Sequence, residues 1–200
     1  MKKSQKFYLV IKRLIDLIGS FIGIFVMLAL IWWWVLILNL ISTKGHPIFV
    51  SERTGKDGKT IGIVKFRSMK LEIDPNLTSE EIKKIENPYT WFGKFLRISN
   101  IDETLQLVNI FLGQMAFIGP RPLIDIDNDH TTIEIRRKNG AIHLRPGISG
   151  YAQIHGRTKV SAEEKANLDG YYYEHFSLWL DIKIFIITIL QSIGIGRRNS

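Results

Sequence analysis

The sequence predicts an α+β protein. It is expected to have an N-terminal membrane-embedded helix of re-entrant course and a helix-rich cytosolic domain with a small β-hairpin and interfacial amphipathic helices. Three observations predict this fold. Residues 17–41 hold no ionisable side chain, two β-rich segments flank an Asp-Gly turn, and apolar residues recur at helical spacing further along the chain. We expect a membrane-anchoring segment over residues 1–41 and one domain over residues 42–200.

The apolar run is 25 residues long, and a bilayer-spanning helix needs roughly 20. It exceeds the apolar region of about 7 to 15 residues in a cleavable signal peptide, and no small-x-small site follows it, so it is expected to stay in the mature protein. A buried core helix is the alternative. The three successive tryptophans at 32–34 favour the membrane.

Both flanks of the run are basic, which suits a hairpin that enters and leaves on the cytoplasmic face. A single tilted span is the alternative, because no proline breaks residues 17–41. Gly19, Ser20 and Gly23 are candidates for a bend. Asp16, at the start of the run, is either a headgroup-level ion pair or a helix-end charge.

The first elements after the run form a hairpin. Segments 47–50 and 60–66 are β-rich, and Gly55-Lys56-Asp57-Gly58 between them has turn chemistry. A surface helix or insert with mixed charge follows, starting at Thr78-Ser79-Glu80-Glu81.

A second helix is predicted from Ser99, because Ile101, Leu105, Val108 and Leu112 repeat at helical spacing. Locally, Ser99 reads as an N-cap with Asp102 in the first turn. The Asp102-Glu103 pair also suits a phosphoryl-transfer site with a carboxylate nucleophile. Local sequence does not separate capping from catalysis.

Two basic segments come next. Gly119-Pro120-Arg121-Pro122 restrains the backbone on both sides of one arginine, which suits phosphate binding or a plain rigid turn. The glycine-rich segment 145–157 permits close backbone approach to a ligand, and Tyr151 in it could stack on a base. The last element, 177–195, is expected to be either an interfacial helix inserted at headgroup level or a core helix.

Composition narrows the function. The net charge is +8 and the pI about 9.7, which points to an anionic partner. Zero cysteines exclude a disulfide scaffold, a cysteine-ligated metal and a thiol nucleophile. The five histidines are too dispersed for a short metal motif, so oxygen ligands are expected for any metal. No helix-turn-helix, zinc or RNA-binding signature accompanies the scattered basic residues, and nucleic acid is not an expected partner.

Taken together and in order, these segments resemble the bacterial sugar transferases, the monotopic phosphoglycosyl transferases. The resemblance covers nearly the whole chain and is closest in length to the minimal members. The motifs that carry it are Lys12-Arg13-x-x-Asp16, Lys65-Phe66-Arg67-Ser68-Met69, Leu96-Arg97 with Asp102-Glu103 and Gln106-Leu107-x-Asn109, Gly119-Pro120-Arg121-Pro122, Arg145-Pro146-Gly147-Ile148-Ser149-Gly150, and Ser177-x-Trp179-Leu180-Asp181-x-Lys183.

The resemblance implies an enzyme of the bacterial cytoplasmic membrane, with residues 42–200 as the catalytic domain on the cytoplasmic face. It would transfer a sugar 1-phosphate from a UDP-sugar to undecaprenyl phosphate, release UMP and use Mg²⁺. The implied partners are both substrates, the lipid bilayer and downstream glycosyltransferases, in capsule, O-antigen, exopolysaccharide or glycoprotein assembly. The implied site comprises the catalytic Asp102 and Glu103, with Asp102 also a metal ligand, and the substrate-binding Lys65, Arg67, Arg97, Arg121, Arg145, Gln153 and Arg157.

In the resemblance, Asp102 is the covalent nucleophile and Glu103 assists the acceptor. This chain departs from the family in two places. Many members have Ser-Pro where this chain has Leu28-Ala29, and many read Leu-Pro after the catalytic pair, where this chain has Thr104-Leu105. The alternative function is a membrane-tethered, non-catalytic binding or scaffold protein.

Overall fold

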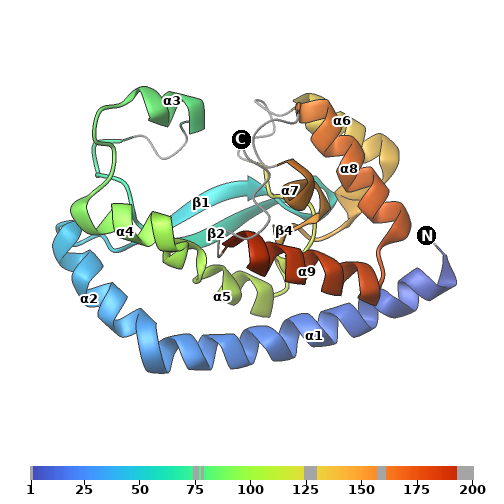
Figure 1. The fold of residues 1–200 in the computed structure, drawn as a ribbon, viewed down its shortest axis with the longest axis horizontal. Coiled ribbons are helices and arrows are strands. Elements are labelled where there is room, and N and C mark those ends of the chain that lie inside the picture. Colours follow the sequence, from blue (N-terminus) through green and yellow to red (C-terminus); the bar gives the residue numbers. More distant parts are fainter. Residues whose placement is uncertain (1, 74–76, 78, 124–129, 157–160, 193–200) are drawn as a thin grey trace.

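The computed structural model describes residues 2–73, 77, 79–123, 130–156 and 161–192 (Figure 1). Short π or 3₁₀ turns are labelled η. The elements in chain order are α1 Lys3–Met27, η1 Leu28–Trp32, α2 Trp33–Ser42, β1 Ile48–Thr54, η2 Lys56–Gly58, β2 Thr60–Phe66, α3 Ser79–Lys84, α4 Trp91–Ser99, η3 Ile101–Glu103, α5 Gln106–Phe111, β3 Ala116–Ile118, α6 His130–Asn139, η4 Ala141–His143, β4 Gly147–Ser149, α7 Tyr151–Gly156, α8 Ala162–His175 and α9 Leu178–Ser192.

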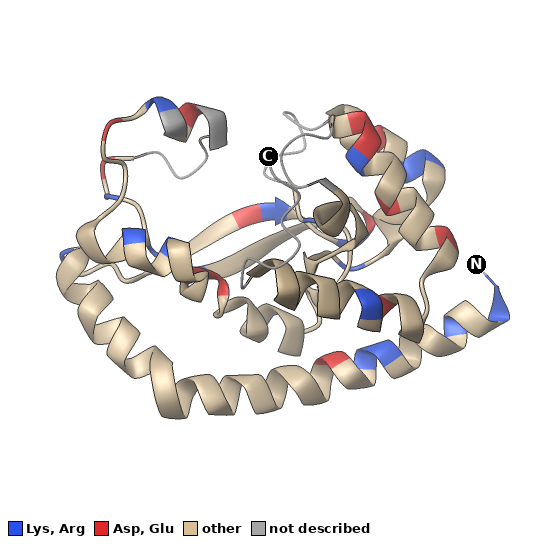
Figure 2. Cartoon of the chain, viewed as in Figure 1, with Lys and Arg blue, Asp and Glu red and all other residues tan. Residues whose placement is uncertain are grey.

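The N-terminal helix is continuous from Lys3 to Ser42, and among the described residues it alone is long and apolar enough to cross a membrane. One turn of π-helix, η1, separates α1 from α2, and the helix changes direction between them (Figure 1). Most of its apolar side chains are exposed, and no charged residue interrupts it after Asp16 (Figure 2). A π turn adds one residue to the helical repeat, so it bends a helix without proline. The break therefore lies at Leu28–Trp32.

Gly19, Ser20 and Gly23 do not bend α1; they allow it to pack closely against other elements. A Cβ on Gly19 would lie 2.9 Å from the ring of Phe117, and one on Gly23 would lie 3.1 Å from Leu107. Ser20 is fully buried. These residues let α1 pack closely on the strand β3 and the helix α5.

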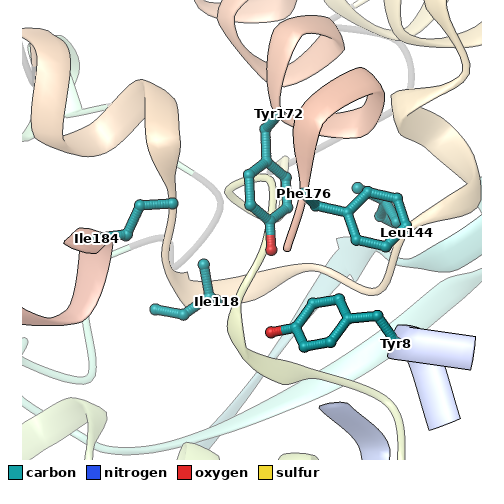
Figure 3. Packing of buried hydrophobic residues seen from close by; sticks show 6 residues of the cluster. All are labelled: Tyr8, Ile118, Leu144, Tyr172, Phe176 and Ile184. Carbon is teal, nitrogen blue, oxygen red and sulfur yellow. The ribbon is translucent and has the colours of Figure 1, made fainter. Parts of the chain in front are cut away.

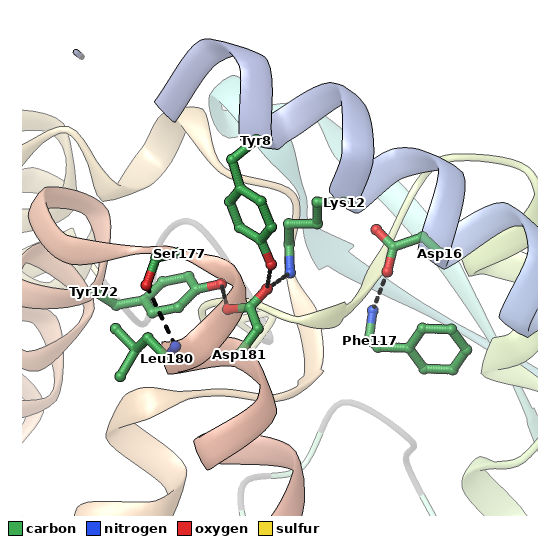
Figure 4. Close-up of polar contacts among 8 residues, drawn as sticks. All are labelled: Tyr8, Lys12, Asp16, Phe117, Tyr172, Ser177, Leu180 and Asp181. Atoms are coloured by element: carbon green, nitrogen blue, oxygen red, sulfur yellow. Dashed lines mark hydrogen bonds and ion pairs between the residues drawn. The ribbon is translucent and has the colours of Figure 1, made fainter. Parts of the chain in front are cut away.

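The charged residues of α1 dock it to the rest of the chain. Arg13 donates through its two terminal nitrogens to the carbonyls of Ile110 and Phe111, at 2.7 and 2.9 Å, at the end of α5. Asp16 Oδ1 accepts from the Phe117 amide at 3.0 Å (Figure 4). The prediction of a helix-end charge at Asp16 is wrong, because α1 continues past it and its buried carboxyl binds the backbone of β3.

The C-terminal helix α9 packs one face on the core, as the core-helix alternative for segment 177–195 expected, and leaves another face exposed. Its inner face carries Ile184, buried in a core cluster (Figure 3) that also holds Tyr8, Ile118, Leu144, Tyr172 and Phe176. Its outer face is apolar and exposed, with Trp179 80 % exposed. Asp181 binds the hydroxyls of Tyr8 and Tyr172 at 2.7 and 2.6 Å and the ammonium of Lys12 (Figure 4). One carboxylate thus joins α1, α8 and α9.

The predicted hairpin is confirmed. Strands β1 and β2 pair antiparallel with Thr54 opposite Thr60, and the turn places Asp57 and Gly58 at positive φ, +58° and +77°. The helix expected near Thr78 is present as α3, and Thr78 itself lies outside the described residues.

A second, parallel strand pair was not predicted. Strand β3 pairs with β4 so that Ala116 faces Gly147 and Ile118 faces Ser149. Beside this pair, Gly119 and Pro120, which follow β3, lie against the backbone of Arg145 to Gly147 at the start of β4.

Candidate active site

The Asp102-Glu103 pair lies on a tight turn between two helices. Helix α4 ends at Ser99, and Asn100 adopts the left-handed conformation with φ 56° and ψ 18°. A single 3₁₀ turn, Ile101–Glu103, leads into α5. The predicted N-cap at Ser99 is wrong, because the Ser99 hydroxyl donates back to the carbonyls of Phe95 and Leu96 in the preceding helix.

Apolar contacts hold this turn in place. Leu105 is buried in a cluster with Trp32, Phe66, Phe92 and Leu96, and Ile101 packs against the same cluster. Burying such side chains stabilises a fold by about 1.5 to 3 kcal/mol each. The turn is therefore fixed on both sides of the carboxylates.

Lys65 reaches the pair from the strand β2. Its Nζ lies 2.8 Å from Glu103 Oε1. The strand is aligned with α5 by Asn109, whose Oδ1 accepts from the Val64 amide at 3.0 Å and whose Nδ2 donates to the Gly62 carbonyl at 2.6 Å. Asn109 is buried, so these two hydrogen bonds set the register between the lysine and the carboxylates.

Asp102 is only 8 % exposed. Burial raises the pKa of its carboxyl from 3.8 to about 6, the neighbouring Glu103 adds to the rise, and Lys65 and Arg97 oppose it. A group with this pKa is about nine-tenths ionised at pH 7. Asp102 is thus a weakly solvated carboxylate beside two cations, which is the state a nucleophile needs and one that is often found at functional sites.

The arginine loops meet across the parallel strand pair. The Gly119 amide donates to the Ser149 carbonyl at 2.8 Å, and the Gly147 amide donates to the Pro120 carbonyl at 2.9 Å. A Cβ on Gly119 would lie 2.3 Å from the Arg145 carbonyl oxygen, and one on Gly147 would lie 2.1 Å from the Gly119 nitrogen. Sequence reasoning assigned the glycines near Arg145 to a ligand. The structure shows that they let one loop's backbone approach the other.

A buried ion pair supports the Arg121 loop. Arg136 donates twice to Asp169 Oδ2, at 2.9 and 2.6 Å, and once to the Arg121 carbonyl, at 3.0 Å. Burial raises the pKa of the Asp169 carboxyl, and Arg136 opposes this rise. The backbone of Arg121 is thereby held, while its side chain is exposed.

The structure brings together four of the sequence-predicted residues: Asp102, Glu103, Lys65 and Arg97. Of the other predicted residues that the structure describes, Arg121 is exposed and three contact different partners. The guanidinium of Arg67 lies 5.2 Å from the Phe49 ring centroid, Arg145 Nε donates to the Gly113 carbonyl at 2.7 Å, and Gln153 Nε2 donates to the Ile148 carbonyl at 3.3 Å. Arg157 lies outside the described residues.

Asn109 and Arg136 were missing from the predicted site. Asn109 belongs to the motif Gln106-Leu107-x-Asn109 that carries the family resemblance. Local sequence does not distinguish a buried asparagine that binds the backbone of a strand from an asparagine on the surface. Arg136 has as its partner a carboxylate 33 residues away. Only the tertiary fold reveals either role.

The acidic pair has the donor chemistry that Mg²⁺ prefers. This ion is commonly bound by one or two carboxylates together with substrate phosphates. No group of three or more His, Cys, Asp or Glu side chains among the described residues has metal-site geometry. Asp102, with Glu103 beside it, therefore fits a magnesium ion that arrives with a diphosphate.

Comparisons with known proteins agree with these observations. The sequence model of the family described as bacterial sugar transferase matches residues 7–194. The chain is 33 % identical over 197 residues to the uncharacterized sugar transferase EpsL of Bacillus subtilis, covering 96 % of this chain and 93 % of that protein.

Two longer proteins match as well. A UDP-galactose-lipid carrier transferase of Erwinia amylovora is 35 % identical over 94 % of this chain and 41 % of its own length. A UDP-glucose:undecaprenyl-phosphate glucose-1-phosphate transferase of Xanthomonas campestris is 33 % identical over 86 % of this chain and 37 % of its own length. The chain thus spans less than half the length of these two relatives.

Proposed function

The chain belongs to the bacterial sugar transferase family, and from this membership we propose that it transfers a sugar 1-phosphate from a UDP-sugar to undecaprenyl phosphate and releases UMP. The names of two relatives support the reaction class: one is a UDP-glucose:undecaprenyl-phosphate transferase and the other a UDP-galactose-lipid carrier transferase. The observation that carries the proposal on this chain is the buried Asp102 carboxylate, held beside Glu103 and Lys65.

In the first step, a carboxylate oxygen of Asp102 attacks the β-phosphorus of the UDP-sugar. The bond from that phosphorus to the bridging oxygen breaks, and UMP leaves with the electron pair. An aspartyl phosphosugar remains on the enzyme. Asp102 is suited to this step because it is ionised at pH 7 and poorly solvated, so little water must be removed before attack.

In the second step, a phosphate oxygen of undecaprenyl phosphate attacks the same phosphorus. The aspartyl bond breaks, Asp102 regains its carboxylate, and the product is a lipid diphosphate-linked sugar. Glu103 lies next to the nucleophile and would accept a proton from the incoming phosphate when that group arrives protonated. Its ion pair with Lys65 fixes the Glu103 carboxylate at 2.8 Å from the ammonium.

Charge neutralisation is the other requirement, because an anion must attack an anion. Lys65 and Arg97 act electrostatically on Asp102, and the Arg121 and Arg145 loops are candidates for the phosphates of the substrates. Mg²⁺ bound by Asp102 and the diphosphate would add positive charge at the same place.

The bent N-terminal helix supports a membrane location for the acceptor. Apolar side chains are exposed on α1 and α2, and more are exposed on the outer face of α9. We therefore propose that the protein lies in the cytoplasmic membrane with its catalytic domain on the cytoplasmic face. The bend at η1 supports a helix that enters and leaves by the same face.

The reaction is tested with the protein in membranes, Mg²⁺, undecaprenyl phosphate and a panel of UDP-sugars, with released UMP as the readout. Release that depends on the acceptor for one donor would support the proposal and identify the sugar. Absence of release for every donor, beside a working control enzyme, would favour the non-catalytic alternative.

The covalent step needs its own test. We expect the wild-type protein to retain label from a sugar- and β-phosphate-labelled donor when the acceptor is omitted, and Asp102→Asn to retain none. Undiminished turnover by Asp102→Asn would refute Asp102 as the nucleophile.

A further inference from the structure

The bend of the N-terminal helix contacts the turn that carries the carboxylate pair. The bend is the π turn η1, Leu28–Trp32, and Thr104 ends the 3₁₀ turn that holds Asp102 and Glu103. Trp32, the last residue of η1, donates from Nε1 to the Thr104 hydroxyl at 2.9 Å.

The hydrogen bond between Trp32 and Thr104 is held by buried packing and by a second hydrogen bond of Thr104. The Trp32 side chain is 6 % exposed and belongs to the same apolar cluster as Leu105. The Thr104 hydroxyl in turn donates to the Ile101 carbonyl at 2.8 Å. The same oxygen therefore donates one hydrogen bond within the 3₁₀ turn and accepts another from the indole. Thr104 therefore links the helix bend to both ends of the turn that carries Asp102 and Glu103.

The position of the link follows from the π turn. A π turn holds about one residue more than an α turn. In an unbroken α-helix the Trp32 side chain would therefore point in a different direction around the helix axis. The neighbouring tryptophans lie outside the contact. Trp33 and Trp34 stack on each other, with ring centroids 4.0 Å apart, and Trp34 is 55 % exposed.

We propose that Trp32 is a positioning residue for the catalytic turn: its hydrogen bond to Thr104 couples the bend of the membrane helix to the placement of Asp102 and Glu103. This extends the proposed function, because the turn so placed is the one that carries the nucleophile. The indole-hydroxyl contact restrains both segments.

The contact is tested first without any substrate, by amide hydrogen exchange of the full chain in nanodiscs. The amides of Glu103 and Thr104 report on the turn, because they donate to the carbonyls of Asn100 and Ile101. Loss of one buried hydrogen bond should speed their exchange by about 2- to 10-fold. We expect this in Trp32→Phe, which keeps a ring but loses the donor, and in Thr104→Val, which keeps the shape but loses both the acceptor for the indole and the donor to the Ile101 carbonyl.

Two matched variants and a double variant complete the exchange test. Thr104→Ser keeps the hydroxyl and should restore wild-type exchange, and Trp34→Phe removes an indole outside the contact and should change nothing. The double variant of Trp32→Phe with Thr104→Val should exchange no faster than the faster single variant. Wild-type exchange in both single variants, an equal effect of Trp34→Phe, or additive effects would each overturn the proposal.

Turnover supplies the second readout. Misplacement of a catalytic turn should lower kcat by about 2- to 10-fold in both single variants and leave KM for the UDP-sugar unchanged. A raised KM with unchanged kcat would overturn the positioning role. If the wild-type protein releases no UMP, the proposed function fails, and the exchange measurements still decide whether the bend and the turn are coupled.

Discussion

Replacing Asp102 by asparagine should stabilise the protein while it abolishes turnover. The folded state holds this carboxyl at a pKa of about 6, against 3.8 for the ordinary group. At 1.36 kcal/mol per pKa unit, ionised Asp102 destabilises the fold by up to about 3 kcal/mol. Asparagine carries no charge and has nearly the same shape, so it removes this destabilisation.

The sign of the pH dependence follows from the raised value. Below pH 3.8 the carboxyl is protonated in both states, and the charge contributes nothing. Between pH 3.8 and about 6 the unfolded chain loses its proton while the folded chain keeps it, so the wild-type protein loses stability relative to the variant. Above pH 6 the difference is constant. Asp102→Asn should therefore gain over the wild type as the pH rises from 4 to 6.

Thermal unfolding of the detergent-solubilised protein in EDTA measures this difference. For a chain of this size, about 3 kcal/mol corresponds to a rise in Tm of up to roughly 6 to 12 °C at pH 7.5, with little difference at pH 4. Glu134→Gln, at an exposed carboxyl of α6, serves as the control and should show no such pH-dependent gain. A lower Tm for Asp102→Asn at pH 7.5, or an equal offset at both pH values, would refute the assignment of a destabilised nucleophile.

Three further substitutions test the site. Lys65→Met should shift the acidic limb of kcat/KM, set by Asp102 near pH 6, to higher pH, because Lys65 lowers the pKa of that carboxyl; an unshifted limb in the pH profile would contradict this. Gly119→Ala should destabilise the fold by about 3 kcal/mol or more in urea unfolding, because its Cβ would lie 2.3 Å from a backbone oxygen, and wild-type stability would contradict the close approach of the loops. Arg136→Met should destabilise by about 3 to 5 kcal/mol in the same assay, because it leaves Asp169, 1 % exposed, as an unpaired buried charge; a loss below about 1 kcal/mol would show that the pair does not support the loop.

The sequence predicted the elements that depend on near neighbours. The hairpin was readable because Asp57-Gly58 favours positive φ and two β-rich segments flank it. The order of several motifs singled out the acidic pair as a candidate site, and the structure places Lys65 against it. Turn residues, β-rich segments and the order of motifs can all be read without knowing which residues are in contact in the folded protein.

The errors have two physical causes, a local backbone turn at Ser99 and distant partners elsewhere. Ser99 followed by Asp102 has the spacing of a helix start, yet the helix that it belongs to ends there, because Asn100 turns left-handed. Asp16 looked like a charge at a helix end, and its partner is a backbone amide 101 residues away. The parallel pairing of β3 with β4 brings distant loops together, and neither strand, at three residues, has a periodic pattern to read.

The bonds of Asp181 also set an order of events during synthesis. Its partners Tyr8 and Lys12 precede it by 173 and 169 residues, so they leave the ribosome long before it. At about 5 to 20 residues per second, that interval is roughly 8 to 35 s. Throughout it, α1 can meet the lipid but has no C-terminal helix to hold it. With the proposed membrane location, insertion of the N-terminal helix would come first, and closure of the domain upon it waits for the arrival of α9.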